Sequence, residues 1–525
     1  MQQKKLIKIL NKKKLFHFDY LIFLIIINSI VFTFYTGFRG VYPIDSFIIF
    51  DSGFKVLNGI HPFKDYWTVT GPLLDYLQSI FFYLFDVNWF SYVLHAGFIN
   101  CLVSLSLFYF LLKIGVEKKY SFFYALSISI LAYPSAGTPF VDHHAVLLSF
   151  IALLFFLLGI KKDKKVFWIL SGFFLVFSFF SKQVPSAYVG IFFTVILIFK
   201  HFLKNETKNY FYFFYSGITG VFLFLCFFFI NGIPLENFII QYILYPLTIG
   251  ENRVESYVHN FKNTILDFKF IYISILPLII IFFNKSLKKN ILNNKDELLF
   301  LVVFIISVLI FIYNQTITKN QILIFFLIPF CLGVSHYILM SKFNKNQTIY
   351  LLLILLVITT FKYHFRYNEN KKFMELENIN LSGAVDAKLL DKKLSGLKWI
   401  TKKYFNNPQF EINKLIEIKK IMTNDKNNKI LVSDHQVLPA LIDNKNFAPN
   451  KWFDPLSIPG KKNKYFQTYQ NFFLLKLKEQ NIVNVYVVER NKLKIFQTIF
   501  IDHQCFKKTV INEMGIMLNI TKCLN

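Results

Sequence analysis

Long apolar runs separated by short polar segments fill the first two thirds of the chain. A run of about 20 apolar residues is long enough to cross the hydrocarbon core of a bilayer as a helix. The pattern predicts eleven membrane spans, at residues 20–36, 90–112, 121–134, 144–160, 166–180, 184–200, 210–230, 267–283, 297–313, 321–340 and 347–363. Because further spans follow the first and no small-residue cleavage site separates them, we interpret the first run as a retained anchor.

The pattern changes at about residue 364, where the apolar runs shorten and charged residues become frequent. Short runs rich in β-branched residues predict strands, and longer amphipathic runs predict helices. A strand–loop–helix unit, a second strand and two helices are predicted at residues 430–442, 481–489, 387–404 and 411–423. We therefore expect a transmembrane domain over residues 1–363 and a small α/β domain over residues 364–525.

The composition agrees with a membrane protein. Of the 525 residues, 54% are hydrophobic and the mean hydropathy is +0.45. Soluble domains contain about 45–50% apolar residues, so the composition excludes a soluble enzyme, and it excludes a disordered chain as well. The formal net charge of +27, taken alone, is typical of proteins that bind nucleic acids.

The distribution of the basic residues along the chain indicates membrane orientation rather than nucleic-acid binding. Alternate connections between the predicted spans carry 22 Lys and Arg residues, whereas the other connections carry 7. Cytoplasmic loops are the ones enriched in Lys and Arg. The N-terminus is therefore expected in the cytoplasm, and an odd number of spans places the C-terminal domain outside. We expect no nucleic-acid partner.

The first outside loop, residues 37–72, carries the most informative pattern. Asp45 stands between the first span and a predicted short interfacial helix, which Asn58-Gly59 ends; Gly71-Pro72 opens the next helix. Asp45 has two interpretations at this stage. It is either the N-cap of the short helix or a general base at the membrane surface.

The sequence of this loop resembles that of a known superfamily. Asp45, a helix, Gly59, Pro62, Asp65 and Gly71-Pro72 occur in the order found in the first periplasmic loop of GT-C, polyprenyl-phosphate-dependent glycosyltransferases. The similarity is to the protein mannosyltransferase-like and lipopolysaccharide-core transferase-like branch (glycosyltransferase family 39-like), and it covers roughly residues 20–270. Ser46 and Phe63 stand where that branch usually has Glu and Tyr.

The resemblance implies both a fold and an activity. The fold would be a polytopic all-α bundle in the bacterial inner membrane with a periplasmic α/β domain. The activity would be inverting transfer of a sugar from a polyprenyl-phosphate donor to a periplasmic glycan, lipid or protein acceptor. Carried over residue by residue, Asp45 is the catalytic base, which takes the proton of the attacking hydroxyl.

The second outside loop contains Asp142, His143 and His144. Family members commonly carry acidic or His residues here, so the resemblance assigns His143 and His144 to the donor phosphate and Asp142 to a supporting role. A divalent metal, Mg or Mn, held by Asp45, Asp142 and His143 is a second possibility. The structural alternative is an Asp at a helix N-terminus followed by interfacial His residues.

Two cations stand on the sparsely charged outside face. The resemblance assigns Lys182, in a Lys-Gln pair, to the donor phosphate. Arg253 is assigned to the same phosphate because Arg is rare in this Lys-rich chain and a guanidinium fork matches phosphate oxygens. Asp65 and Glu251 would support the site on the acceptor side. Alternatively, Lys182 only extends its ammonium to the membrane surface. Arg253 would then be a solvated loop charge, and Arg39 would bind the phosphate instead.

Other interpretations stay open. A transporter or flippase would need charged residues inside the spans and broken or repeated helices, and a non-catalytic assembly protein would leave the clustered outside carboxylates without a role. Cys505 and Cys523 could form a disulfide outside the cell. Asp434-His435, after a predicted strand, is interpreted as a turn rather than a catalytic pair.

Overall fold

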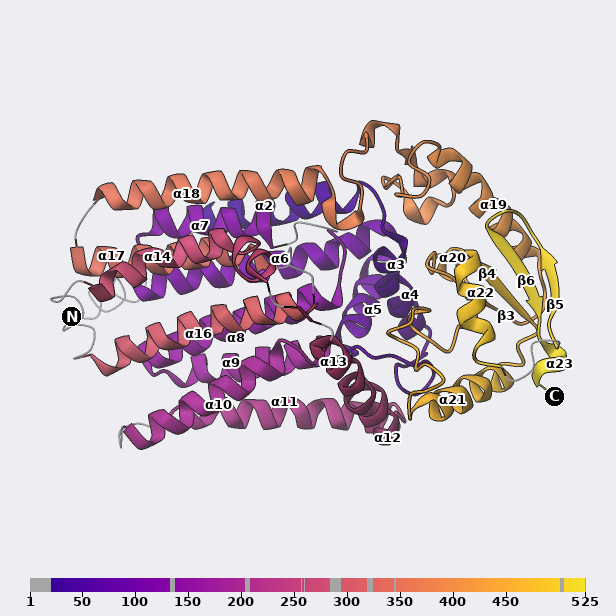
Figure 1. The fold of residues 1–525 in the computed structure, drawn as a ribbon, viewed down its shortest axis with the longest axis horizontal. Helices are drawn as coiled ribbons and strands as arrows, with labels where there is room; N and C mark the ends of the chain where they lie inside the picture. Colours follow the sequence, from indigo (N-terminus) through magenta and orange to yellow (C-terminus); the bar gives the residue numbers. More distant parts are fainter. Residues whose placement is uncertain are drawn as a thin grey trace, which may run out of the picture.

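The computed structural model describes residues 20–132, 137–203, 208–255, 257–258, 260–283, 294–318, 324–343, 346–500 and 505–524. Long helices form a bundle at one end of the molecule, and a smaller domain with a β-sheet forms the other end (Figure 1). A layer of short helices lies between the two. This layer contains the segments in which the sequence predicts the site.

The bundle consists of helices that lie where the apolar runs predict spans. They are α2 (Tyr20–Gly37), α6 (Trp89–Ile114), α7 (Lys118–Leu131), α8 (Val141–Lys162), α9 (Lys165–Ser181), α10 (Ser186–Leu203), α11 (Phe211–Ile230), α14 (Lys269–Phe283), α16 (Lys295–Thr318), α17 (Leu327–Phe343) and α18 (Asn346–His364). Among the described residues, six helices are long and apolar enough to cross a membrane, and further apolar helices are shorter. The membrane fold class is confirmed, and the count of eleven spans stays a prediction.

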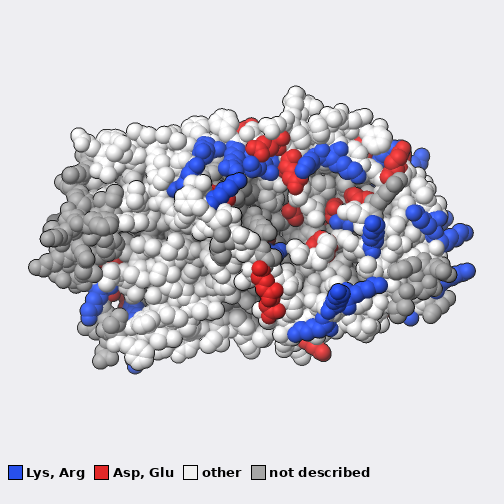
Figure 2. All heavy atoms as spheres, viewed as in Figure 1, with Lys and Arg blue, Asp and Glu red and all other residues white. Residues whose placement is uncertain are grey.

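Helix α8 runs through the interior of the bundle and packs against α6, α9 and α16. Of its apolar window, 94% is buried, whereas only 22% of the corresponding window of α11 is buried. A helix that is apolar all round belongs in the core of a bundle or against lipid. Figure 2 shows the bundle surface with few charged side chains, while most charges lie toward the C-terminal domain. This distribution is typical of a surface that faces hydrocarbon.

The first outside segment folds into α3 (Pro43–Ser46), α4 (Ile48–Leu57) and α5 (Leu73–Phe85). The predicted order of short helix, turn and second helix is therefore present. However, α4 is not interfacial, because every residue from Ile48 to Val56 is buried. One hydrophobic core joins this segment to the C-terminal domain and includes Phe47, Phe50 and Trp399. The short helix is covered by protein on both sides.

The long segment between α11 and α14 folds into α12 (Leu235–Phe238), the π-helix η1 (Ile239–Leu244), α13 (Tyr245–Glu255) and the π-helix η2 (Lys262–Leu266). Helix α13 lies beside the junction of the bundle and the C-terminal domain (Figure 1). Tyr245 belongs to the hydrophobic core of the C-terminal domain. This contact brings the C-terminal part of the segment next to that domain.

The C-terminal domain contains a four-stranded sheet in the order β3-β4-β6-β5. Strands β3 (Lys429–Val432) and β4 (Asn484–Val488) are parallel, and β5 (Lys507–Val510) and β6 (Gly515–Asn519) are added in antiparallel fashion. The main helices are α19 (Pro408–Asn424), α20 (Leu438–Leu441), α21 (Phe466–Glu479) and α22 (Arg490–Gln497). The predicted strands and the helix at 411–423 are confirmed, and Cys505 and Cys523 form a disulfide.

The predicted helix over residues 387–404 is wrong. This segment forms the 3-10 turns η7 (Ala387–Leu389) and η8 (Lys392–Leu394), and the strand β2 (Lys398–Trp399), which pairs with β1 (Val385–Asp386). The side chains of Asp386 and Asp391 accept hydrogen bonds from the backbone N–H groups two residues later. Such local bonds compete with helix formation. Gly396 adds a left-handed residue at φ +87°.

Candidate functional site

The loop that carries Asp45 is tied to the C-terminal domain at its beginning. The N–H of Lys398 donates to the Phe38 carbonyl at 2.9 Å, and the N–H of Gly40 donates to the Lys398 carbonyl at 2.9 Å. The N–H of Val41 then donates to the Ile400 carbonyl at 3.0 Å. The chain therefore leaves α2 as an extended segment paired with a strand about 360 residues away.

Asp45 itself lies in the one-turn helix α3, which Pro43 begins. Neither α3 nor α4 has a side-chain cap hydrogen bond, so the N-cap interpretation of Asp45 finds no support. The carboxylate instead lines a cavity of about 870 Å³. Because a short helix fixes its residues only through its surroundings, the C-terminal domain and the bundle together determine where Asp45 lies.

This cavity lies where the bundle, α13 and the C-terminal domain meet, and Figure 2 shows the surface hollowed in this region with acidic side chains around it. Five of the residues predicted from the sequence line it: Asp45, Asp142, Lys182, Glu251 and Arg253. They come from four separate parts of the chain. The structure thus brings a carboxylate and two cations to one cavity large enough for a small ligand.

Asp142 and Lys182 form an ion pair in the cavity wall, with 2.5 Å between Nζ and Oδ1. Asp142 lies in the first turn of α8 and Lys182 is the C-cap of α9. Each charge therefore opposes the partial charge of its helix end, which is favourable. The helices α8 and α9 are packed antiparallel neighbours, so the start of one and the end of the other reach the same side of the bundle.

The residues around Lys182 fix it against the first outside loop. The Nε2 group of Gln183 donates to the carbonyls of Val69, at 3.0 Å, and Tyr242, at 2.5 Å. The N–H of Gly71 donates to the Ser181 carbonyl at 3.0 Å. A Cβ atom at Gly71 would lie 1.9 Å from the carbonyl oxygen of Phe180. Glycine is therefore required at this position by close approach of two backbones.

Helix α13 contributes Glu251 and Arg253 to the cavity, near its C-terminal end. Glu251 is exposed and Arg253 is partly buried. An Arg guanidinium presents a planar set of donors that matches phosphate oxygens. The cavity therefore has two cationic groups, Lys182 and Arg253, that suit an anionic headgroup.

The environment of Asp45 favours its protonated form. Burial raises the pKa of Asp45 to about 8, and the carboxylates of Asp142 and Asp454 add to the rise. Lys182 lowers the pKa in part. A general base works best when its pKa is near the operating pH. The arrangement is therefore suited to proton acceptance near neutral to mildly alkaline pH.

Three of the predicted residues lie elsewhere. Asp65 accepts the N–H of His61 at 2.8 Å and lies 3.8 Å from Lys476 of the C-terminal domain. His143 and His144 are buried in α8, and Nε2 of His144 lies 3.2 Å from Nε2 of His95. None of the three is among the described residues that line the cavity, so their predicted roles at the donor and acceptor stay predictions.

The residues predicted to hold Mg or Mn do not gather into one site. In the described parts of the chain, no group of three or more His, Cys, Asp and Glu side chains is arranged to hold a metal ion. Asp45 and Asp142 line the same cavity, but His143 does not, and Lys182 engages Asp142. The residues present do not fit the predicted three-ligand site, and we derive no step through a metal.

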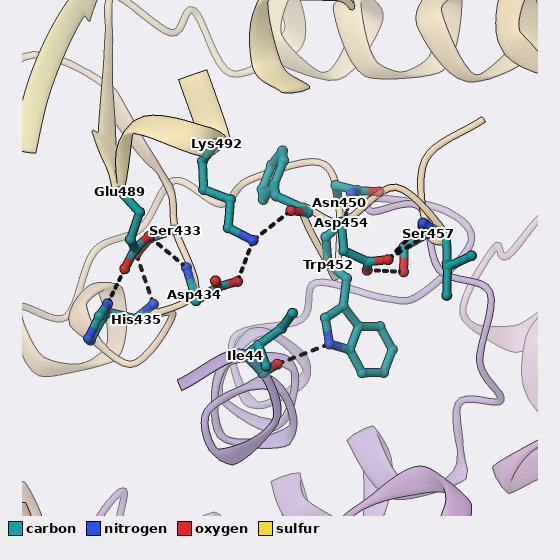
Figure 3. A network of polar contacts seen from close by, with 12 residues as sticks. Ile44, Ser433, Asp434, His435, Asn450, Trp452, Asp454, Ser457, Glu489 and Lys492 are labelled. Atoms are coloured by element: carbon teal, nitrogen blue, oxygen red, sulfur yellow. Dashed lines mark hydrogen bonds and ion pairs between the residues drawn. The ribbon is translucent and has the colours of Figure 1, made fainter. Parts of the chain in front are cut away.

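The C-terminal domain forms part of the cavity wall through Trp452, Asp454, Leu456 and Ser457. The Asp454 carboxylate accepts the N–H groups of Leu456, at 2.8 Å, and Ser457, at 3.2 Å. The indole N–H of Trp452 donates to the Ile44 carbonyl at 3.2 Å (Figure 3). The sequence pattern alone predicts no role for these residues. Their only signal is a Trp followed by an Asp-Pro pair in a loop.

His435 is held between two carboxylates, Glu411 at 3.1 Å and Glu489, as Figure 3 shows in part. Burial alone would lower the pKa of His435, but Glu489 and Glu411 raise it to about 10. The ring stacks on Trp399, which in turn stacks on Phe47. His435 is not among the described residues that line the cavity. The network lies where the C-terminal domain contacts Phe47 of the first outside loop.

Comparison with protein families gives one match, which covers the segment from the first outside loop to the end of α11. Residues 69–229 match the family model described as dolichyl-phosphate-mannose-protein mannosyltransferase. The predicted family resemblance is confirmed. The matched mannosyltransferase segment contains both Asp142 and Lys182, whereas Asp45 precedes it and Arg253 follows it. A search of curated proteins finds no match.

Solved structures with a similar overall arrangement are distant in sequence. ArnT from Cupriavidus metallidurans bound to undecaprenyl phosphate is 12% identical, with a TM-score of 0.49 over 96% of this chain and 98% of that one. The oligosaccharyltransferase AglB from Archaeoglobus fulgidus, in complex with an inhibitory peptide and a dolichol-phosphate, is 12% identical. Its TM-score is 0.46 over 89% of this chain and 69% of that one. A complex of the Archaeoglobus fulgidus oligosaccharyltransferase with Zn and sulfate is also 12% identical. Its TM-score is 0.44 over 89% of this chain and 68% of that one.

Proposed function

We propose that this protein is a membrane glycosyltransferase that moves a sugar from a polyprenyl-phosphate donor to an acceptor outside the cytoplasm. The observation that carries the proposal is the cavity lined by Asp45, Lys182 and Arg253 at the boundary between the bundle and the C-terminal domain. The match of residues 69–229 to a mannosyltransferase family model supports the reaction class.

The reaction needs one bond to form and one to break. An acceptor hydroxyl oxygen attacks the anomeric carbon of the sugar while the bond from that carbon to the donor phosphate oxygen breaks. Asp45 takes the hydroxyl proton, and polyprenyl phosphate leaves with the electron pair. Attack from the side opposite the phosphate inverts the anomeric carbon.

The cations stabilise the leaving group. Negative charge on the departing phosphate grows in the transition state, so preorganised positive groups lower the barrier. Lys182 and Arg253 are the residues that fill this role in the proposal. Because Lys182 pairs with Asp142, its ammonium is already oriented in the cavity wall before the donor binds, which reduces the cost of reorganisation.

The proposal places the active site on the outer side of the membrane. The headgroup of the donor would occupy the cavity, and its polyprenyl chain would extend among the apolar helices. The N-terminus would be cytoplasmic and the C-terminal domain periplasmic or extracellular, in agreement with the positive-inside distribution. The acceptor would be a glycan, a lipid or a protein, and the family match does not distinguish these classes.

The proposal is tested by donor turnover. Membranes containing the protein are incubated with a panel of radiolabelled polyprenyl-phosphate sugars, and the products are separated by mass. We expect one donor to lose its sugar and release polyprenyl phosphate, only when the protein is present. Mass spectrometry of lipid-linked sugars in a deletion strain should show that donor accumulating. Movement of an intact donor across the bilayer without loss of sugar would instead establish a flippase.

The same assay tests whether donor turnover requires a divalent metal ion. Chelation with EDTA followed by addition of Mg or Mn measures whether turnover depends on the ion. Full activity after chelation would assign Asp142, His143 and His144 to phosphate binding or structure.

A further inference from the structure

The wall that the C-terminal domain contributes to the cavity includes one large aromatic side chain, Trp452. Its side chain is 9% exposed, and its ring forms part of the cavity lining. The polar edge of the ring is turned toward the loop that carries Asp45 (Figure 3). Trp452 therefore belongs to the cavity and to the contact between the domain and the first outside loop.

The hydrogen bond of Trp452 reaches the residue next to the proposed base. Its indole N–H donates to the carbonyl of Ile44 at 3.2 Å, and Ile44 directly precedes Asp45 in α3. Helix α3 is four residues long and has no side-chain cap bond. A single helical turn is not stable alone, because fixing its backbone dihedral angles costs more free energy than its hydrogen bond contributes. External contacts therefore set the orientation of this turn.

Trp452 is itself held firmly on the bundle. The preceding residue, Lys451, places its ammonium 2.6 Å from the Asp75 carboxylate and 3.2 Å from the Thr70 hydroxyl. Lys451 and Asp75 are both buried. The backbone N–H of Lys451 also donates to the carbonyl of Trp67 at 2.9 Å. The segment before Trp452 is thus anchored to the loop before α5 and to α5 itself.

We propose that Trp452 is a positioning residue that holds Ile44 and, through it, the Asp45 carboxylate in the cavity. The C-terminal domain then completes the catalytic site instead of only covering it. The inference rests on the proposed function, because its readout is sugar transfer. Small displacements of a catalytic group reduce the rate steeply, by about a hundredfold for 1 Å in favourable cases.

The test separates the hydrogen bond from the ring. The Trp452→Phe variant keeps an aromatic ring in the cavity wall and removes the N–H donor. We expect kcat for sugar transfer to fall about tenfold, because Asp45 loses its orientation. The KM for the donor should stay within about twofold, because the shape of the cavity is kept. If the Phe variant does not yield folded protein, Trp452→Leu also removes the donor and keeps an apolar side chain in the cavity wall.

A matched control is available in the same segment. The hydroxyl of Tyr245 in α13 donates to the carbonyl of Leu456 at 3.0 Å, which is a bond of similar length between the bundle side and the C-terminal domain. Tyr245→Phe removes that bond without touching Ile44. We expect its kcat to stay within about twofold of the parent protein.

Two results would overturn the inference. Equal kcat values for the Trp452 and Tyr245 variants would show that the bond to Ile44 has no special role. A raised KM with unchanged kcat would make Trp452 a binding wall only. Both results require active parent protein, so they leave the proposed function intact. A parent protein that turns over no donor would instead overturn the proposed function.

Discussion

At the scale of single residues, the chemistry depends on how one carboxylate is held. Asp45 is partly buried, and desolvation together with the carboxylates of Asp142 and Asp454 raises its pKa to about 8, well above that of an exposed Asp. The ammonium of Lys182, which pairs with Asp142, lowers this pKa in part. The proposed base is thus a group whose charge state changes near neutral to mildly alkaline pH.

This leads to a predicted pH dependence. A carboxyl group accepts a proton only when it is ionised, so the rate of transfer should rise with pH and level off above about pH 8. Single-turnover rates measured between about pH 6 and about pH 9.5 check the prediction. A rate that is constant across this range, or that falls as the pH rises, would contradict a base with the pKa of Asp45.

Lys182 permits a second prediction at this scale. Lys182→Met removes a charge from the cavity and leaves the Asp142 carboxylate without its ion-pair partner. Contacts between a cation and a charged ligand are worth about 1.5–3 kcal/mol, so the KM for the donor should rise about tenfold or more. Lys64→Met is the matched control, because Lys64 donates to the Asn231 carbonyl at 2.9 Å and does not line the cavity. An unchanged KM in the Lys182 variant would remove Lys182 from phosphate binding.

At the scale of elements, the central feature is the interlocking of the first outside loop with the C-terminal domain. The loop pairs with residues 398–400 on one side of Asp45 and with residues 449–451 on the other. Helix α4 is buried between these contacts. The buried ion pair of Lys451 and Asp75 joins partners 376 residues apart.

Breaking that ion pair should destabilise the whole assembly. Lys451→Met leaves the Asp75 carboxylate buried, with the hydroxyls of Ser52 and Tyr66 as its remaining hydrogen-bond partners among the described residues. The loss of one partner of a buried pair costs about 3–5 kcal/mol. We expect a clear drop in the thermal unfolding midpoint in detergent, and a smaller drop when Asp75→Leu is added. An unchanged midpoint in the single variant would contradict the role of this pair.

At the scale of the whole molecule, the described charges and the apolar helices agree with a protein that crosses the membrane many times. The C-terminal domain, residues 364–525, contains 27 Lys and Arg against 15 Asp and Glu, an excess of 12. Long translocated domains are not bound by the positive-inside distribution. Its positive charge is therefore compatible with a position outside the cell membrane.

The predicted orientation of the chain in the membrane can be measured with a reporter fusion. An alkaline phosphatase domain, which is active only outside the cytoplasm, is fused after Asn525, and a second fusion is made in the connection after α9. We expect activity from both fusions. A matched fusion in the Lys-rich connection between α8 and α9 should be inactive, because Lys161, Lys162, Lys164 and Lys165 mark it as cytoplasmic. Activity only in the connection between α8 and α9 would reverse the topology.

Much of the fold could be predicted because hydrophobic periodicity is a local signal. The apolar runs predicted the positions of the bundle helices, and β-branched residues predicted β3 and β4. The segment 387–404 was predicted wrongly because its turns depend on the side chains of Asp386 and Asp391 and on pairing with the first loop. Tertiary contacts of that kind leave no periodic signal.

The candidate site was predictable in part because the connections between predicted spans are visible in the sequence. Asp45, Asp142, Lys182, Glu251 and Arg253 stand in or beside connections predicted on one face of the bundle, and functional residues are concentrated in such connections. His143 and His144 follow Asp142 directly but lie inside α8, because successive helical side chains point in different directions. Trp452 was not predictable as part of the cavity, since its role depends on how a distant domain docks.

The most direct test of the account is the Asp45→Asn variant in a sugar-transfer assay with a polyprenyl-phosphate donor. Asn keeps the shape of the side chain and cannot act as the base, so we predict that transfer falls by at least about a hundredfold while the protein folds and binds donor. Asp86→Asn is the matched control, because Asp86 is exposed and is not among the described residues that line the cavity. Transfer by Asp45→Asn at the rate of the parent protein and of this control would contradict the central claim.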